Sequence, residues 1–177
     1  MATPRPLRCA ILVVSDRAAA GIDEDTSRPA IVGLLTRLLD ADVAAQATIP
    51  SDRQEIAAQL RDWVDEEDFD LILTIGGIGF APCDLTPEAT SDVVDRAAPG
   101  LAEAMRAAAR AITPYSTLTR GIAGIRGQTL IVNLPSGPKG ATENLNVILQ
   151  VLPRAIALLR GESSDPALYD YRPRTVV

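Results

Sequence analysis

Three short apolar runs limit what this 177-residue chain can fold into more than any other feature of its sequence. They cover residues 7–15 (LRCAILVVS), 70–75 (DLILTI) and 129–133 (TLIVN). Their hydrophobicity is continuous and rich in β-branched residues, which indicates strands buried on both faces, as in a parallel sheet. A weaker strand is predicted over 43–49, where Pro50 ends it.

Segments with the hydrophobic period of a helix separate these strands. Ser27 is the expected N-cap of the first helix. Ser51 and Gln54 have the spacing of a capping box at the start of the second. Thr86 carries a similar start signal, and Pro99-Gly100 should separate that helix from one over 101–112.

The segment 114–127 reads as irregular, and Pro153 should kink or split the last helix. Strands that alternate with helices imply right-handed crossovers. We therefore predict an α/β fold: a doubly wound, mainly parallel sheet with helices on both faces. A single domain should span 1–177, with a core over about 7–161 and a C-terminal tail over 162–177.

The composition excludes several classes of function. A net charge of −6 argues against binding to nucleic acid or to an anionic membrane. With no histidine, and with only Cys9 and Cys83, a zinc, copper or iron–sulfur site is not expected. Cys9 should pack as a small hydrophobe. No signal-peptide pattern or membrane span of about 20 apolar residues is seen, so a cytoplasmic location is expected.

Unusual loops follow the three apolar runs, and ligands of open α/β sheets bind at the carboxyl ends of strands. Gly76, Gly77 and Gly79 form a Gly-Gly-x-Gly turn, which can aim backbone N–H groups at an anion or serve only the fold. Neither a P-loop nor a dinucleotide fingerprint is present. Asp84 follows the turn, either as a magnesium ligand or as an ordinary aspartate at a helix start.

Basic side chains near these loops have two interpretations. Arg17 follows Ser15 and Asp16, and its planar fork suits phosphate, but a solvated loop is the alternative. Lys139 follows the third run and would meet phosphate as a point charge. Arg120 and Arg126 either hold an anion or are surface charge.

At these residues the chain resembles the molybdopterin adenylyltransferase family, which includes the bacterial MogA and MoaB proteins. The resemblance covers residues 7 to about 161. Three segments carry it: 13–27 (VVSDRAAAGIDEDTS), 71–90 (LILTIGGIGFAPCDLTPEAT) and 123–145 (AGIRGQTLIVNLPSGPKGATENL). The second is the most specific, with a Gly-Gly-x-Gly turn, a short spacer and then Asp-x-Thr-Pro-Glu-Ala.

The resemblance implies an α/β domain that assembles as a homotrimer and binds molybdopterin, ATP and Mg²⁺. The implied reaction transfers AMP to the terminal phosphate of molybdopterin and releases pyrophosphate. The product would pass to a molybdate-inserting enzyme. Asp84 matches the catalytic, magnesium-associated aspartate of the family. The other matching positions surround the ligand: Ser15, Asp16, Gly76, Gly77, Gly79, Gly137, Pro138 and Lys139.

Three positions depart from the family pattern. Ile78 replaces the threonine of the usual Gly-Gly-Thr-Gly turn, and Ser136 and Gly137 exchange the order of Pro-Gly-x-Pro. Ser51 replaces an aspartate, which leaves Asp52 as a possible substitute metal ligand. These departures keep open a protein of the same fold that binds molybdopterin or a pathway partner without transferring AMP. A flavodoxin-like domain for another nucleotide or flavin fits the fold alone.

Overall fold

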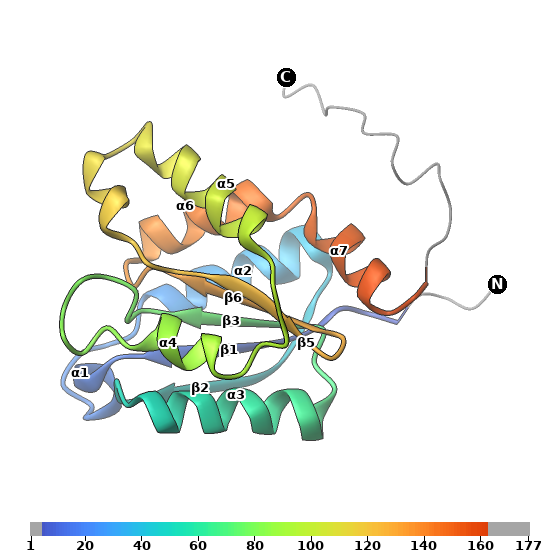
Figure 1. Cartoon of the computed structure of the whole chain (residues 1–177), viewed down its shortest axis with the longest axis horizontal. Helices are drawn as coiled ribbons and strands as arrows, with labels where there is room; N and C mark the ends of the chain where they lie inside the picture. The colour runs from blue at the N-terminus through green and yellow to red at the C-terminus, as the bar shows by residue number, and fades with distance from the viewer. Residues whose placement is uncertain (1–4, 163–177) are drawn as a thin grey trace.

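The computed structural model describes residues 5–162, so the predicted tail from residue 163 onward lies outside the described part. A six-stranded sheet of order β2-β1-β3-β6-β5-β4 forms the middle layer (Figure 1). Strands β1, β2, β3 and β6 are parallel, and only β5 runs in the opposite direction, pairing antiparallel with both β6 and β4, which confirms the mainly parallel sheet. The bounds are β1 (Arg8–Val14), β2 (Asp42–Ile49), β3 (Leu71–Ile75), β4 (Arg96–Ala97), β5 (Ala123–Arg126) and β6 (Thr129–Leu134).

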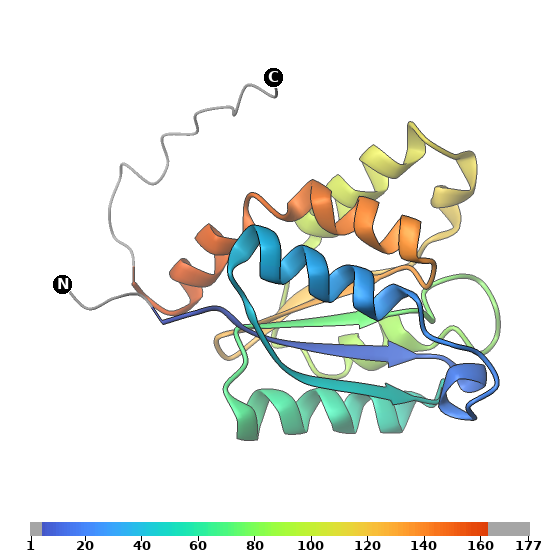
Figure 2. The same ribbon diagram turned by 180° about the vertical axis from the view of Figure 1, so that it is seen from behind.

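Helices cover both faces of the sheet, as predicted, with α2, α5, α6 and α7 on one face and α3 and α4 on the other (Figures 1 and 2). The short α1 lies beyond the end of β1. The bounds are α1 (Asp16–Ala19), α2 (Ser27–Leu39), α3 (Arg53–Glu67), α4 (Thr86–Ser91), α5 (Pro99–Arg110), the 3₁₀ helix η1 (Pro114–Leu118), α6 (Pro138–Ile148) and α7 (Leu152–Leu159).

Each central strand contributes side chains to two hydrophobic cores, one on each face of the sheet. In β1, Cys9 and Ile11 pack with the α2–α6 layer, whereas Ala10 and Leu12 pack with the α3–α4 layer. Because successive side chains of a strand point to opposite faces, a strand between two cores must be apolar at every position. The continuous hydrophobicity of 7–15 therefore reflects its central place, and Cys9 is fully buried as expected.

Two of the predicted helix caps are wrong by one residue each. Thr26 is the N-cap of α2 in place of Ser27, and the side chain of Asp25 accepts from the N–H groups of Ser27 and Arg28. Asp52, not Ser51, is the N-cap of α3, and its Oδ1 accepts from two amides at 2.9 Å. The physical reason is that two neighbouring acceptors satisfy nearly the same capping pattern.

Two predictions about the second half of the chain have opposite outcomes. The segment 114–127 is not wholly irregular, because it contains η1 and the strand β5. Gly124 made the β5 segment look irregular in the sequence. A glycine is needed there because an added Cβ would lie 2.6 Å from the side chain of Val94. Pro153 does accompany a break, since α6 ends at Ile148 and α7 begins at Leu152.

Candidate functional site

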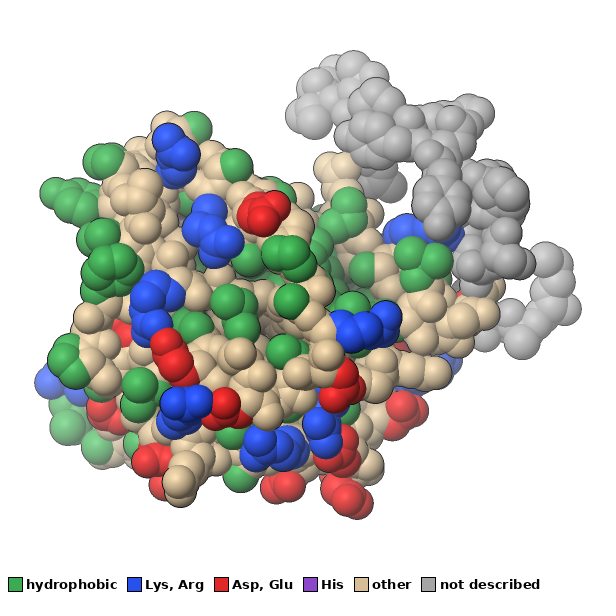
Figure 3. All heavy atoms as spheres, in the orientation of Figure 1, with side chains coloured by type: hydrophobic (Ala, Val, Ile, Leu, Met, Phe, Trp, Pro, Cys, Tyr) green, Lys and Arg blue, Asp and Glu red, His purple; other side chains and the backbone are tan. Residues whose placement is uncertain are grey.

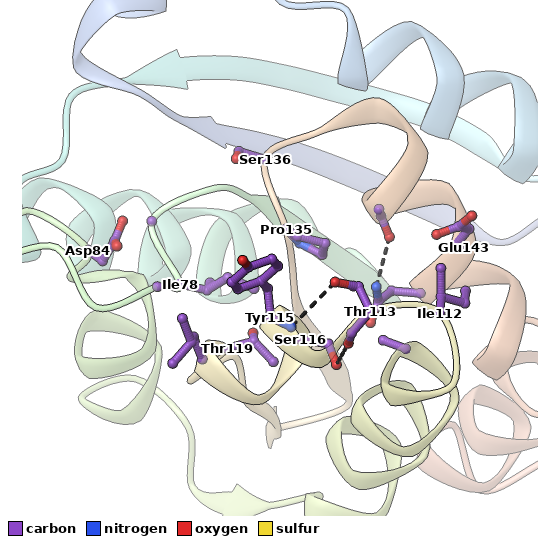
Figure 4. A pocket seen from close by; sticks show the side chains of 16 residues that line it. Ile78, Asp84, Ile112, Thr113, Tyr115, Ser116, Thr119, Pro135, Ser136 and Glu143 are labelled. Atoms are coloured by element: carbon purple, nitrogen blue, oxygen red, sulfur yellow. Dashed lines mark hydrogen bonds between the residues drawn. The ribbon is translucent and has the colours of Figure 1, made fainter.

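A cavity of about 380 Å³ opens at the carboxyl ends of β3 and β6, and its size suits a small-molecule ligand (Figure 4). Asp84 lies at one side and Glu143 at the other, with Tyr115 between them. The β3 loop contributes Gly77, Ile78, Gly79 and Asp84, and the β6 end with α6 contributes Pro135, Ser136, Gly140, Glu143 and Asn144. The remaining wall is the end of α5 together with η1.

The glycine turn after β3 adopts a backbone that other residues rarely take. Gly76 and Gly77 have φ angles of +100° and +67°. A Cβ at Gly76 would lie 2.5 Å from the carbonyl oxygen of Val14, and one at Gly77 would lie 2.4 Å from Oγ1 of Thr86. The buried Thr86 hydroxyl donates to the carbonyl of Gly76 (2.9 Å). Thr86 therefore fixes the turn rather than capping α4, whose N-cap is Leu85.

The same turn lines the cavity and contains backbone hydrogen-bond donors that the fold leaves unused. Within residues 5–162, no protein acceptor takes the N–H groups of Gly77, Ile78 or Gly79. Successive free amides in a turn of this kind form a concave site for an anion. Ile78 is buried and lacks a hydroxyl, but its backbone N–H remains available. Its replacement of threonine therefore removes one possible donor and leaves the backbone cradle in place.

Asp84 fits a single-carboxylate magnesium site. The N–H of Ala81 donates to its Oδ2 (2.9 Å), while Oδ1 has no protein partner among the described residues. A Cβ on Gly79 would lie 2.7 Å from Oδ2, so the absence of a side chain there lets the carboxylate sit against the turn. Among the described residues, no three acidic, cysteine or histidine side chains are placed so that together they could hold a metal ion. Mg²⁺ commonly uses one or two carboxylates plus substrate phosphates, which this arrangement provides for.

Arg120 holds the loop that carries Asp84. Its Nε donates to the carbonyl of Gly79 (2.7 Å), and Nη2 donates to the carbonyl of Asp84. The carboxylate of Glu88, on α4, forms an ion pair with the same guanidinium. The hydrogen bond from Arg120 lowers the pKa of Glu88, and the same bond raises the pKa of Arg120. Neither interpretation of Arg120 from the sequence, anion ligand or surface charge, describes this role.

The loop after β6 is held by a contact from α2. The hydroxyl of Ser27 donates to the carbonyl of Ser136, which lines the cavity. Gly137 and Pro138 begin α6 without lining the cavity, and its first amides lie at this edge. The Lys139 side chain is 81% exposed, and its Nζ lies 3.9 Å from Glu143. It is therefore free to move toward a ligand but is not positioned by the fold.

The end of β1 lies outside the cavity lining. The Ser15 side chain caps α1 by accepting from Ala18 N–H (3.2 Å), and Asp16 accepts from the N–H of Ser51 (2.7 Å). Arg17 forms a two-bond pair with Asp23 (2.6 and 2.8 Å). Asp52, the N-cap of α3, is also absent from the lining. The structure therefore groups Gly77, Gly79 and Asp84 but leaves the predicted β1 residues apart from them.

The sequence analysis missed the wall formed by α5 and η1. Tyr115 lines the cavity although 78% of its surface is exposed, and Ile112 and Leu118 lie beside it. The sequence around Tyr115 was interpreted only as the start of an irregular segment, and the tyrosine between Ile112 and Leu118 was the one available signal. The full contribution of this wall is Ala109, Ile112, Thr113, Tyr115, Ser116, Leu118 and Thr119.

The fold and the site together define an open α/β domain with a ligand-sized cavity at the carboxyl ends of its parallel strands. Comparison with known proteins gives the family: residues 10–154 match the "Probable molybdopterin binding domain" family, and the chain belongs to it. This confirms the resemblance found in the sequence.

Individual relatives align along most of the chain. The molybdopterin adenylyltransferase of Escherichia coli K12 is 36% identical over 185 residues, covering 96% of this chain and 95% of that protein. The crystal structure of the molybdopterin biosynthesis enzyme MoaB from Thermus thermophilus superposes with a TM-score of 0.83 at 48% identity, covering 88% of this chain and 97% of that one. Gephyrin from Dictyostelium discoideum is 35% identical, but the chain spans only 24% of its length.

Proposed function

We propose that the protein is a molybdopterin adenylyltransferase of molybdenum cofactor biosynthesis, with Asp84 as its catalytic, metal-binding carboxylate. Support comes from its family and from relatives of that name, two of which, from E. coli and Helicobacter pylori, align along at least 95% of their own lengths. The observation that carries the proposal is the pairing of Asp84 with the glycine turn. A carboxylate oxygen without a protein partner lies beside unused backbone donors, at the edge of a cavity of ligand size.

The proposed reaction is nucleotidyl transfer. An oxygen of the terminal phosphate of molybdopterin forms a bond to the α-phosphorus of ATP, the bond from that phosphorus to the bridging oxygen breaks, and pyrophosphate leaves. Mg²⁺ at Asp84 would neutralise charge on the phosphates. The attacking phosphate is already anionic, so the protein needs no strong general base. The N–H groups of Gly77 and Gly79 would orient phosphate oxygens, and the cavity walls would hold the reactants together.

The decisive experiment mixes purified protein with molybdopterin, ATP and Mg²⁺ and follows adenylylated molybdopterin and pyrophosphate. Asp84→Asn should lower turnover by at least about 100-fold while pterin binding persists, because the variant keeps the shape of the side chain but loses the charge. Equal turnover in the two proteins would refute the role of Asp84. Pterin binding without any product in the parent protein would instead identify a binding protein of the same fold.

The remaining expectations stay part of the proposal. Mg²⁺ as the ion, transfer of product to a molybdate-inserting enzyme and a cytoplasmic location all accompany the proposed reaction. A homotrimer is the expectation from the family, and the exposed apolar side chains near η1, where hydrophobic atoms gather on the surface, would favour self-association (Figure 3). Sedimentation at equilibrium would test the trimer. Separately, none of the helices between residues 5 and 162 is both long and apolar enough to cross a bilayer.

A further inference from the structure

We propose that Arg120 is a positioning residue: by joining the two ends of the loop 79–84, it sets where Asp84 holds a divalent cation. The binding of a cation by Asp84, its identity and its use in AMP transfer rest on the proposed function, whereas the fixing of the loop by Arg120 does not. Arg120 itself is absent from the cavity lining, so it must act through the loop.

The loop has few other restraints. Between Ile78 and Asp84 the chain forms no helix or strand, and its internal bonds join only Ala81 and Asp84. Among the described residues outside 76–88, Arg120 alone hydrogen-bonds to 78–84. Its backbone N–H donates to the carbonyl of Ile78 (2.7 Å), and its guanidinium reaches the carbonyls of Gly79 and Asp84.

The position of the guanidinium is fixed by contacts that lead back to the hydrophobic core. Its partner Glu88 belongs to α4, which buries Ala89 and Thr90 against the sheet. The Thr90 hydroxyl accepts from the amide of Asn133 (2.9 Å), a buried residue of β6. A rigid path therefore runs from β6 through α4 to Arg120 and then to the loop.

A planar fork is required because the guanidinium meets its acceptors in different directions. Nε and Nη2 donate to two carbonyl oxygens of the loop, while Nη1 pairs with the Glu88 carboxylate. Lysine would keep the positive charge but lacks the fixed planar arrangement of donors. Without the fork, the carbonyl of Asp84 is released, and its carboxylate should sample positions away from the glycine turn.

The test compares Arg120→Gln and Arg120→Lys with the matched control Arg126→Gln. Arg126 also pairs with a carboxylate, that of Asp65 (2.9 and 2.8 Å), but has no contact with the loop. Hydrogen exchange of the Ala81 amide, measured without ligands, reports the loop directly. Binding of Mn²⁺ in the presence of ATP, followed by electron paramagnetic resonance, reports the cation site.

Arg120→Gln should speed exchange of the Ala81 amide at least about 10-fold and weaken Mn²⁺ binding by about 10-fold, as loss of supporting contacts does at metal sites. In the enzyme assay, the Mg²⁺ concentration for half-maximal turnover should rise more than turnover at saturating Mg²⁺ falls. Arg120→Lys should retain most of the defect, whereas Arg126→Gln should resemble the parent.

Unchanged Ala81 exchange and unchanged Mn²⁺ affinity in Arg120→Gln would overturn the inference, as would full recovery in Arg120→Lys. If Arg120→Gln does not fold, Glu88→Gln gives the same test, because it loosens the guanidinium while leaving the loop sequence intact. Absence of turnover in the parent protein would count against the proposed function, while the exchange measurement would still decide the role of Arg120.

Discussion

The parallel strands begin at one side of the sheet, called here the amino edge, and end at the opposite side, the carboxyl edge. Asp70 precedes β3 at the amino edge and Asp84 follows β3 at the carboxyl edge, and the surroundings of the two carboxylates differ. At the amino edge, Asp70 is 2% exposed and both of its oxygens are bound, by Arg160, by Arg5 and by the backbone N–H of Arg8. At the carboxyl edge, Asp84 is half-buried and keeps one oxygen without a protein partner in the described chain.

This difference separates two uses of a carboxylate. A buried charge is tolerated when ion pairs and hydrogen bonds compensate it fully, which suits a structural contact. A carboxylate that is only half satisfied leaves capacity for a ligand, and such positions commonly lie at functional sites. Asp70 ties the end of α7 to the sheet, whereas Asp84 belongs to a loop held by Arg120.

The largest expected effect comes from making the same substitution at both edges. Asp70→Asn should destabilise the fold by about 3–5 kcal/mol, because Arg160, whose side chain is 9% exposed, loses its buried charge partner and keeps only the more exposed Glu162 at 3.5 Å. Asp84→Asn should cost less than about 1 kcal/mol, since it removes no buried ion pair. Urea denaturation of both variants measures the difference. Equal losses of stability would mean that the two edges do not differ in the way proposed.

A second comparison is between the losses of stability caused by replacing two glycines of the carboxyl edge, Gly76 and Gly137, with alanine. Gly76→Ala should cost about 2–3 kcal/mol, because its φ of +100° is unfavourable and the new Cβ would meet the Val14 carbonyl at 2.5 Å. Gly137→Ala is the matched control, since no atom lies within 4 Å of its added Cβ. Thermal melts of the two variants would decide; similar melting temperatures would show that the glycine turn is not strained.

The parts of the fold that could be predicted are those determined by adjacent residues. The run 70–75 indicated a strand buried on both faces, and the turn and Asp84 follow it directly in the chain, so their proximity was also predictable. The Asp52 cap was missed, and Ser51 was predicted instead, because Asp52 and Glu55 repeat the spacing of Ser51 and Gln54 and local sequence does not choose between them.

Features that depend on packing between distant segments could not be read in this way. Strand β5 exists because it pairs with β6, and its Gly124 weakens any local strand signal. The cavity wall around Tyr115 depends on how α5 crosses the sheet and where η1 then lies. The guanidinium of Arg120 meets carbonyls 41 and 36 residues away, a relation that the residue type alone does not suggest.

The smallest effect concerns Cys9, which lies near the amino edge. Burial, and then the negative charges of Asp70 and Asp42, raise its pKa to about 12 from a usual value of 9.0. The folded protein therefore holds this proton more tightly than the unfolded chain, so the contribution to stability is complete below pH 9 and is lost as pH rises toward 12. Between pH 9 and pH 10 the loss should be about 1 kcal/mol.

Urea denaturation of the parent, Cys9→Ala and Cys83→Ala between pH 8 and pH 10 isolates this contribution. Other groups that titrate in this range are shared by all three proteins, so the difference in slope belongs to the thiol. Cys9→Ala should lose less stability with rising pH than the parent, while Cys83→Ala, which removes an exposed thiol, should follow the parent. If the stability of Cys9→Ala falls with rising pH as steeply as that of the parent, the amino edge does not hold the thiol in its neutral form. The contrast in electrostatics between the two edges would then be weaker than the ion pairs of Asp70 indicate.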